Sequence, residues 1–167
     1  MHIAEGVLSA PVLITGAVVA AGAVAYGLKK LDPRQVMMAA ILGAAFFVAS
    51  LIHIPVGPSS VHLLLNGLLG VLLGWSAVPV IFVGLLLQAI LYGFGGLTVL
   101  GVNTATMGLG AVLSWYIFGG LLSVLKPLGA KKAAAVSGFV SGACGVAIAA
   151  VLTALALAFT DEGFKAS

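Results

Sequence analysis

The sequence predicts an all-α, polytopic membrane helix bundle, and three observations lead to this class. Apolar residues make up 62% of the 167 positions, whereas Asp, Glu, Lys and Arg make up only 7%. A soluble domain carries about a quarter charged residues, so an ordinary globular enzyme is excluded. The few charges are also clustered, because residues 35–125, a run of 91 positions, contain none. Residues 1–167 are therefore expected to form a single integral-membrane domain.

Three charge-free runs, 6–28, 35–125 and 133–160, make up most of the chain. A bilayer span needs roughly 20 apolar residues, so these runs hold about six spans. The predicted spans cover about residues 10–28, 35–54, 59–74, 79–93, 104–125 and 133–160.

Cations, prolines and glycines set the boundaries of these spans. A pair of lysines beginning at Lys29 ends the first span, and Pro55 follows the second. Pro79 opens the fourth span, and the glycine-rich segment 93–103 separates it from the fifth. Lys126 ends the fifth span and opens the last connection.

The positions of the cations predict the orientation. Six of the seven Lys and Arg residues lie in the connections 29–34 and 126–132. An N-terminus outside the cell places both connections in the cytoplasm and leaves only Lys165 outside, as the positive-inside rule requires. Residues 1–28 contain no Lys or Arg, and the positive charges follow this apolar stretch. That order is the reverse of a secretory signal, so the segment is expected to remain. The prediction is a multi-pass protein of the cytoplasmic (inner) membrane.

Other partners and chemistries are excluded by composition. No basic stripe with interleaved aromatic residues is present, so the lipid bilayer and not nucleic acid is the expected surroundings. Cys144 is the single cysteine, which rules out a disulfide framework and a cysteine metal site.

The three histidines, His2, His53 and His62, all fall on the predicted outer face, beside the N-terminal amine. Met1 is expected to stay in place because the large residue His2 follows it. A histidine at position two can chelate a metal through the free amine, its own backbone nitrogen and its imidazole. A fourth nitrogen completes a tetragonal site, which favours Ni(II), Cu(II) or low-spin Co(II) over Zn(II) or Mg(II). His62 is the natural fourth donor, and His53 is the competing candidate.

Each of these residues also has a simpler interpretation. A lone histidine at the end of a span more often bonds to backbone or water than to a metal, and this is sufficient for His53. Asn103 and the neighbouring threonines can equally satisfy the irregular backbone of a glycine-rich loop. Glu5 can be an ordinary solvated carboxylate near a helix N-terminus. Spacing alone leaves the metal interpretation of His2 and His62 open.

Three motifs resemble a known family. Residues 1–6, MHIAEG, are similar to the MHIxEG start of the CbiM/NikM substrate-binding (S) subunits of energy-coupling-factor (ECF) transporters for cobalt and nickel. Residues 60–64, SVHLL, are followed by Asn-Gly and resemble the family's SVHLL motif. Residues 95–103, GGLTVLGVN, with Met-Gly at 107–108, resemble its GGxTxLGxN…MG segment. The motifs occur in the family's order.

The resemblance implies a metal site at the outer end. Co(II) or Ni(II), as the bound substrate, would be held in a square plane by the Met1 amine, the backbone nitrogen and imidazole of His2, and the imidazole of His62. The N-terminal segment would dip into the bundle, and the loop 93–103 would help to cover the site. The polar residues expected around the metal or in this cover are Glu5, Ser60, Asn66, Thr98, Asn103 and Thr104.

The resemblance also implies a role and partners. The chain would capture the metal outside and deliver it to the cytoplasm, without being an enzyme. It has no G-x-x-x-x-G-K-[ST] sequence and so cannot power transport itself. The expected partners are a transmembrane coupling (T) subunit, cytoplasmic ATPase subunits and a small accessory membrane subunit.

The chain departs from the family's pattern in three places. Thr106 stands where a second Asn is usual, and Phe94 stands where a polar residue often precedes the paired glycines. Both changes affect hydrogen bonds around the metal ligands. The family's seventh span, which normally follows the region matching 133–160, is expected to be absent from this chain.

Three alternatives remain for the function. A vitamin-binding S subunit of the same architecture would need an aromatic-lined pocket, and the outer ends offer few aromatic residues besides Phe94. An intramembrane metalloenzyme would need a carboxylate within the spans and an H-E-x-x-H motif, and the sequence has neither. A membrane scaffold would not explain why every histidine falls on one face.

Overall fold

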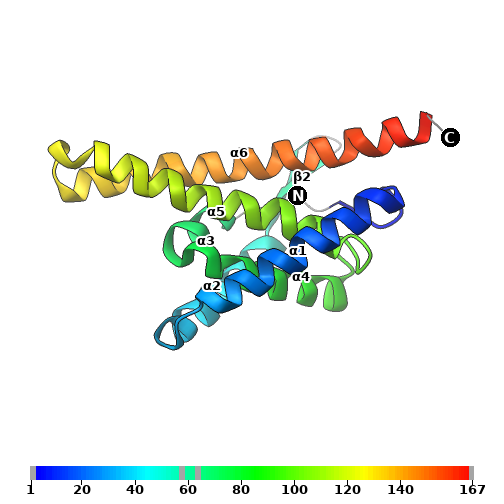
Figure 1. The fold of residues 1–167 in the computed structure, drawn as a ribbon, viewed down its shortest axis with the longest axis horizontal. Helices are drawn as coiled ribbons and strands as arrows, with labels where there is room; N and C mark the ends of the chain where they lie inside the picture. Colours follow the sequence, from blue (N-terminus) through cyan, green and yellow to red (C-terminus); the bar gives the residue numbers. More distant parts are fainter. Residues whose placement is uncertain (1–2, 57–58, 63–64, 166–167) are drawn as a thin grey trace.

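The computed structural model describes residues 3–56, 59–62 and 65–165. Six α-helices make up most of this part of the chain, with one β-hairpin between the second and the third (Figure 1). The elements are α1 (Ala10–Lys30), α2 (Val36–Leu51), β1 (His53–Val56), β2 (Ser59–His62), α3 (Asn66–Leu73), α4 (Ala77–Tyr92), α5 (Leu100–Val124) and α6 (Ala130–Lys165), with single 3-10 turns η1 (Pro33–Gln35), η2 (Gly74–Ser76) and η3 (Lys126–Leu128). The helical class predicted from composition is confirmed.

Local signals explain where two of the helices begin and end. Helix α1 has a proline in its first turn, where no backbone hydrogen bond is lost, and Lys29 and Lys30 in its last turn, where cations offset the helix dipole. Helix α4 ends at Gly93, whose φ of 68° is the left-handed conformation that glycine adopts without strain.

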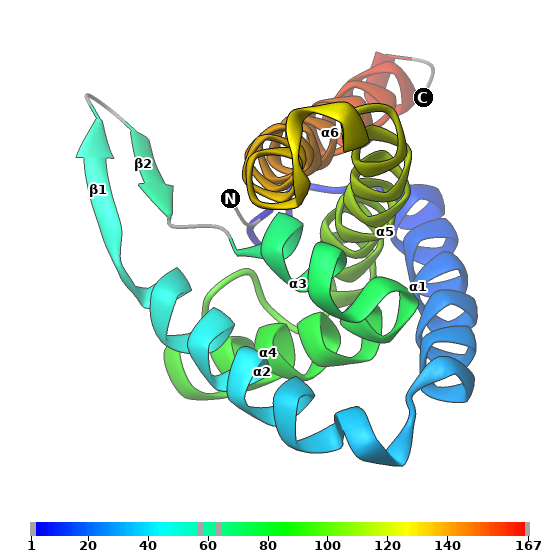
Figure 2. The ribbon, with the colours of Figure 1, turned by 90° about the vertical axis from the view of Figure 1, so that its left-hand side faces the viewer.

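Helix α5 lies at the centre of the bundle. The helices α1, α3, α4 and α6 all pack against it, whereas α2 packs mainly on α4 (Figure 2). The hairpin lies at one side of the bundle, after the end of α2, and pairs His53 with His62 in an antiparallel register. Four helices are therefore held at fixed positions around α5.

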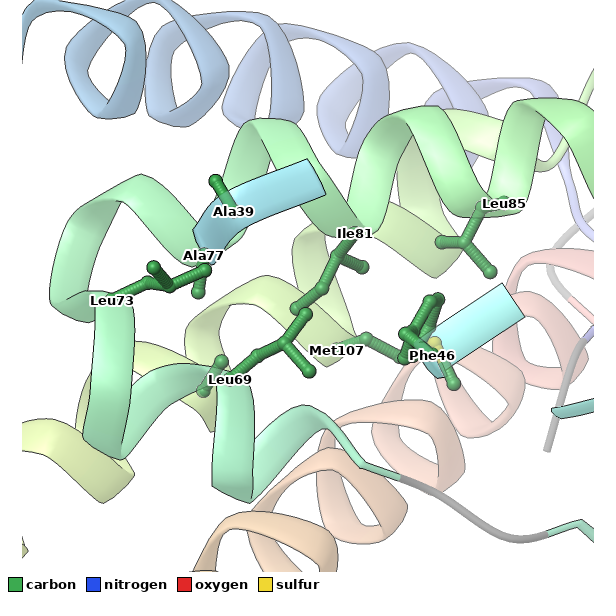
Figure 3. Packing of buried hydrophobic residues seen from close by; sticks show 9 residues of the cluster. Ala39, Phe46, Leu69, Leu73, Ala77, Ile81, Leu85 and Met107 are labelled. Carbon is green, nitrogen blue, oxygen red and sulfur yellow. The ribbon is translucent and has the colours of Figure 1, made fainter. Parts of the chain in front are cut away.

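The main apolar core lies where α2, α3, α4 and α5 meet. Phe46, Leu69 and Ile81 are completely buried there (Figure 3). Leu85 and Met107 approach Phe46 from α4 and α5. The buried members of this cluster are Ala39, Phe46, Leu69, Leu73, Ala77, Ile81, Leu85, Met107 and Ala111.

Glycines let α3 approach α5 and α6 closely. A Cβ at Gly70 would collide with the backbone carbonyl of Ala111 on α5. A Cβ at Gly67 would lie 2.7 Å from the carbonyl oxygen of Gly142 on α6. No side chain fits at either place, so the glycines set the distance between these helices.

The expectation of about six spans is not confirmed, because the described residues contain five helical segments long and apolar enough to cross a bilayer. The difference lies in residues 59–74, which were expected to form the third span. They contain strand β2 and the eight-residue helix α3, which is about 12 Å long against a hydrocarbon core of roughly 30 Å. The chain then turns at Gly74, at φ 57°, into α4. Helices α3 and α4 together, Asn66–Tyr92, form one of the five membrane-crossing segments.

The two cation-bearing connections lie at the same end of the molecule, on opposite sides of the bundle (Figure 2). The turn from α1 to α2 and the turn from α5 to α6 are both at the left end of the molecule in Figure 1. The beginnings of α1 and α5 and the end of α4 are at the opposite end. The structure thus separates Lys29, Lys30 and Arg34 from the N-terminal segment by the length of the bundle, while the orientation in the membrane stays a prediction.

Candidate functional site

The N-terminal segment is fixed to the start of α5 by Asn103. The backbone N–H of Ile3 donates to Oδ1 of Asn103 at 3.1 Å, and Nδ2 of Asn103 donates to the carbonyl oxygen of Ile3 at 3.3 Å. Both residues are almost fully buried, at 4% and 3% exposure. A buried backbone group without a partner is costly, so an amide that satisfies the donor and the acceptor of one residue is a strong constraint. The backbone immediately after His2 is therefore held in place.

The carboxylate of Glu5 is held by the loop before α5. Its Oε1 accepts hydrogen bonds from the backbone N–H of Thr98 at 3.2 Å and from the Thr98 hydroxyl at 3.4 Å. Gly96, at φ 112°, lies directly beneath the Glu5 side chain, and a Cβ there would overlap the carboxylate. The missing side chain at Gly96 makes room for the Glu5 contact.

Apolar packing and one longer link complete the attachment of this segment. Ile3 and Leu8 are buried against Val99 and Val102, which belong to the start of α5. The backbone N–H of Ser9 lies 3.4 Å from the hydroxyl of Thr160 near the end of α6. Residues 3–9 thus cross from α5 to α6 before α1 begins.

The expected metal donors lie largely outside the described residues. Met1 and His2 are not among them, and only the backbone of His62 is. The structure corrects the local expectation for His62, because it lies in strand β2 and not at the outer end of a helical span. Pro55, opposite Ser60, interrupts any helical continuation from α2 and is compatible with a strand at the edge of a sheet. His62 and the competing candidate His53 are direct register partners across the hairpin.

Two of the other predicted residues lie deeper in the bundle. Asn66 is fully buried at the start of α3, and its Nδ2 lies 3.5 Å from the carbonyl oxygen of Gly145 on α6. Thr104 is fully buried on α5, next to Asn103. Within the described part of the chain, Oδ1 of Asn66 and Oγ1 of Thr104 have no hydrogen-bond partner. The structure therefore joins Glu5, Thr98 and Asn103 to the N-terminal segment, whereas Asn66 serves a contact between helices.

Sequence reasoning missed two features of this end. Thr160 was considered only as the end of a span, although it meets Ser9 from 151 positions away. Gln88 was not assigned to the outer end, yet it lies one turn before the end of α4 and donates to the hydroxyl of Ser50, near the end of α2. Both are uncommon polar residues in apolar runs, which was the available signal.

The helices define a multi-pass membrane protein, and its N-terminal segment is bound to one end of the bundle. Residues 2–167 match the family model CbiM, described as a cobalt uptake substrate-specific transmembrane region. The chain belongs to the CbiM family.

Individual relatives agree with this assignment. A putative metal transport protein of Haemophilus influenzae is 45% identical over 157 residues, covering 94% of this chain and 75% of that protein. Cobalt transport protein CbiM 1 of Pelobacter propionicus is 38% identical over 180 residues, covering all of this chain and 77% of that protein. The fused nickel transport protein NikMN of Rhodobacter capsulatus is 38% identical over 116 residues, which are 64% of this chain and 33% of the fused protein.

A solved structure has the same fold. The crystal structure of a truncated transition metal transporter superposes with a TM-score of 0.70 at 28% identity, covering 94% of this chain and 74% of that one. Together the comparisons place the chain in a membrane protein family whose named members transport cobalt or nickel. The nickel relative is itself a fused protein.

Proposed function

We propose that this chain is the substrate-binding subunit of an ECF transporter and captures Co(II) or Ni(II) at the extracytoplasmic face. One observation carries this proposal beyond the family assignment. The backbone of Ile3 is buried and bonded twice to Asn103, which fixes the chain directly after the proposed donors. A free terminus would lose much conformational freedom on binding a metal, and prior anchoring reduces that loss.

Four nitrogens from three residues bind the metal in this proposal. The Met1 amine, the His2 backbone nitrogen and the His2 imidazole form fused chelate rings, and the His62 imidazole is the fourth donor. Four nitrogens in a plane suit Ni(II) and low-spin Co(II). His53, the register partner of His62, is the alternative fourth donor.

The remaining polar residues position and cover the site. Asn103 sets the depth of the N-terminal segment through Ile3, and Glu5 closes the loop 94–99 over it through Thr98. Groups around metal ligands of this kind typically alter affinity about 10- to 100-fold when removed. Ser60 lies two positions before His62 in β2, and Asn66 and Thr104 are fully buried on α3 and α5.

Transport requires the partners that the family resemblance implies. A transmembrane coupling subunit, cytoplasmic ATPase subunits and a small accessory membrane subunit would supply the energy and the movement. The charge asymmetry of the bundle supports an N-terminus outside and cations inside the inner membrane. The fused nickel relative supports a multi-component assembly.

The N-terminal amine provides the most direct test. Acetylating Met1 removes one donor and leaves every side chain intact. Loss of a group that only supports a metal ligand lowers affinity by up to about 100-fold, so loss of a ligand should lower cobalt and nickel affinity by at least about 100-fold. Isothermal titration of the purified subunit measures it, and assembly with the partner subunits checks the fold. The matched pair His62→Ala and His53→Ala assigns the fourth donor. Full affinity after acetylation would eliminate the chelate.

A further inference from the structure

An apolar groove of about 490 Å³ runs along α2 and α4 and reaches the end of α1 at Leu28. Leu28 of α1, Val36 of α2 and Val83 of α4 line it and are 55%, 50% and 51% exposed. Ala40 and Ala44 keep the wall on α2 thin. Helix α2 packs mainly on α4, and the groove follows the line of contact between these two helices. In a bilayer, an apolar molecule must fill this space.

The length of the groove selects the kind of molecule. Its lining on α2 runs from Val36 to Phe47, about 16 Å at 1.5 Å per residue. The hydrocarbon core is roughly 30 Å thick, so the groove covers about one leaflet. A spanning helix from a partner would need a groove about twice as long. A phospholipid acyl chain crosses one leaflet and matches this length.

The charges at one end of the groove select the headgroup. Lys29 and Lys30, in the last turn of α1, and Arg34, in η1, are all exposed. Asp32 is the single acid there and accepts a hydrogen bond from the backbone N–H of Arg34 at 2.8 Å. Three cations against one carboxylate give a net charge of +2. The Lys30 ammonium lies 5.5 Å from the centre of the Tyr26 ring, which keeps it at the end of α1.

We propose that this groove binds one acyl chain of an anionic phospholipid, with the headgroup phosphate at Lys29, Lys30 and Arg34. Clusters of cations at the ends of membrane helices attract anionic lipid headgroups. The lipid chain lies along α2 and α4 and contacts the end of α1 at Leu28. This site lies at the opposite end of the bundle from the proposed metal site and does not depend on it.

Native mass spectrometry of the full chain in detergent tests the lipid class without any substitution. Phosphatidylglycerol and phosphatidylethanolamine with identical acyl chains are titrated separately. We expect one phosphatidylglycerol to be retained with at least about tenfold higher affinity, since each cation near an anionic surface contributes about fivefold. Equal retention of the two lipids would overturn the proposal.

Two triple variants test the headgroup contact. Lys29→Gln with Lys30→Gln and Arg34→Gln is expected to weaken phosphatidylglycerol binding about 10- to 100-fold. Lys126→Gln with Lys131→Gln and Lys132→Gln removes the same charge from the other connection and is expected to change it less than about twofold. Equal losses in both variants would indicate general charge attraction and contradict a built site.

Two neighbouring alanines test the groove itself. Ala44 lines it, whereas Ala45 is exposed on the same helix outside it. Ala44→Phe is expected to abolish lipid retention, and Ala45→Phe to leave it unchanged. If Ala44→Phe instead disperses a dimer that binds no lipid, the groove belongs to a second copy of the chain. If lipid is excluded from the groove only when the partner subunits are present, the groove belongs to a partner helix. This result, like the dimer result, would overturn the proposal.

Discussion

Helix α3 and the segment 3–9 both lie against α5, but glycine packing holds the first and directional hydrogen bonds hold the second. Gly70 allows α3 to touch the backbone of Ala111, with no side chain between them. Ile3 is held by one amide, that of Asn103. The first contact is between two backbones and has no side chain that could move aside, whereas the second consists of two hydrogen bonds to one side chain.

This difference predicts that α3 and residues 3–9 affect different properties of the protein. A collision at the glycine contact must move a helix, so the whole bundle is affected. A lost hydrogen bond at the N-terminal segment releases only a few residues, which can then turn to water. We therefore expect changes at α3 to alter the unfolding of the protein, and changes at residues 3–9 to alter metal affinity.

Gly70→Ala is expected to have the largest effect. Its Cβ would meet the backbone of Ala111, which cannot rotate away as a side chain would. Overpacking of this kind costs about 3 kcal/mol of unfolding free energy. Thermal unfolding in detergent measures the loss, and the fraction that remains folded should bind metal normally. Unchanged stability would show that α3 and α5 are farther apart than described.

Asn103→Leu is expected to come second and to act mainly on metal binding. It leaves both backbone groups of Ile3 without partners, at a cost of about 2 kcal/mol while the segment stays docked. We expect metal affinity to fall about 10- to 100-fold. Thr153→Val is the matched control, because the buried Thr153 hydroxyl donates within its own helix, to the carbonyl of Ala149. Equal effects of both variants would contradict a specific role for the amide.

Gly96→Ala should have a smaller effect, of about 1–2 kcal/mol from the positive φ alone. Its Cβ would also displace the Glu5 carboxylate, so metal affinity should fall as well. Gly93→Ala separates the two causes, since Gly93 has φ 68° but open space around it. Titration of metal into both variants should show a loss only at Gly96. A loss at both positions would assign the effect to loop strain.

The smallest effects are expected at glycines in open space. Gly22→Ala and Gly138→Ala meet no atom within 4 Å. Alanine is favoured over glycine in helices by about 0.5–1 kcal/mol, so both variants should be slightly more stable than the parent chain. Thermal unfolding beside Gly70→Ala would show whether contact or helix propensity decides the outcome. Destabilisation at either site would reveal a neighbour that packs there.

Much of the helical layout followed from the apolar runs. The cation clusters and Gly93 marked helix ends that lie within a few residues of those observed. The prediction of a helical span at residues 59–74 was wrong because hydropathy does not distinguish a helix from a strand over a short apolar run. Residues 59–62 carry no charge and continue into leucines, yet they pair with β1. Pairing with β1 determines the structure of these residues, and the residues of β2 alone do not reveal that pairing.

The site was partly predictable, for a similar reason. Asn103, Thr98 and Glu5 stood out as polar residues in an apolar sequence, and the structure brings all three to the N-terminal segment. Their pairing could not be derived, because Asn103 and Ile3 are 100 positions apart. The family resemblance supplied the expected metal donors. Met1 and His2 lie outside the described residues, so their role stays a prediction.

The bonds of the N-terminal segment also constrain the order in which the protein matures. Asn103, the partner of Ile3, is synthesised 100 residues after it, and Thr160, the partner of Ser9, is synthesised 151 residues after it. At about 5–20 residues per second, the first partner emerges roughly 5–20 s after Ile3. During that time the first residues have no docking place, while α1 to α4 are already being inserted. The end of the bundle that holds residues 3–9 is therefore completed by the last helices to be synthesised. A ribosome that stalls before α6 leaves Ser9 without its contact to Thr160.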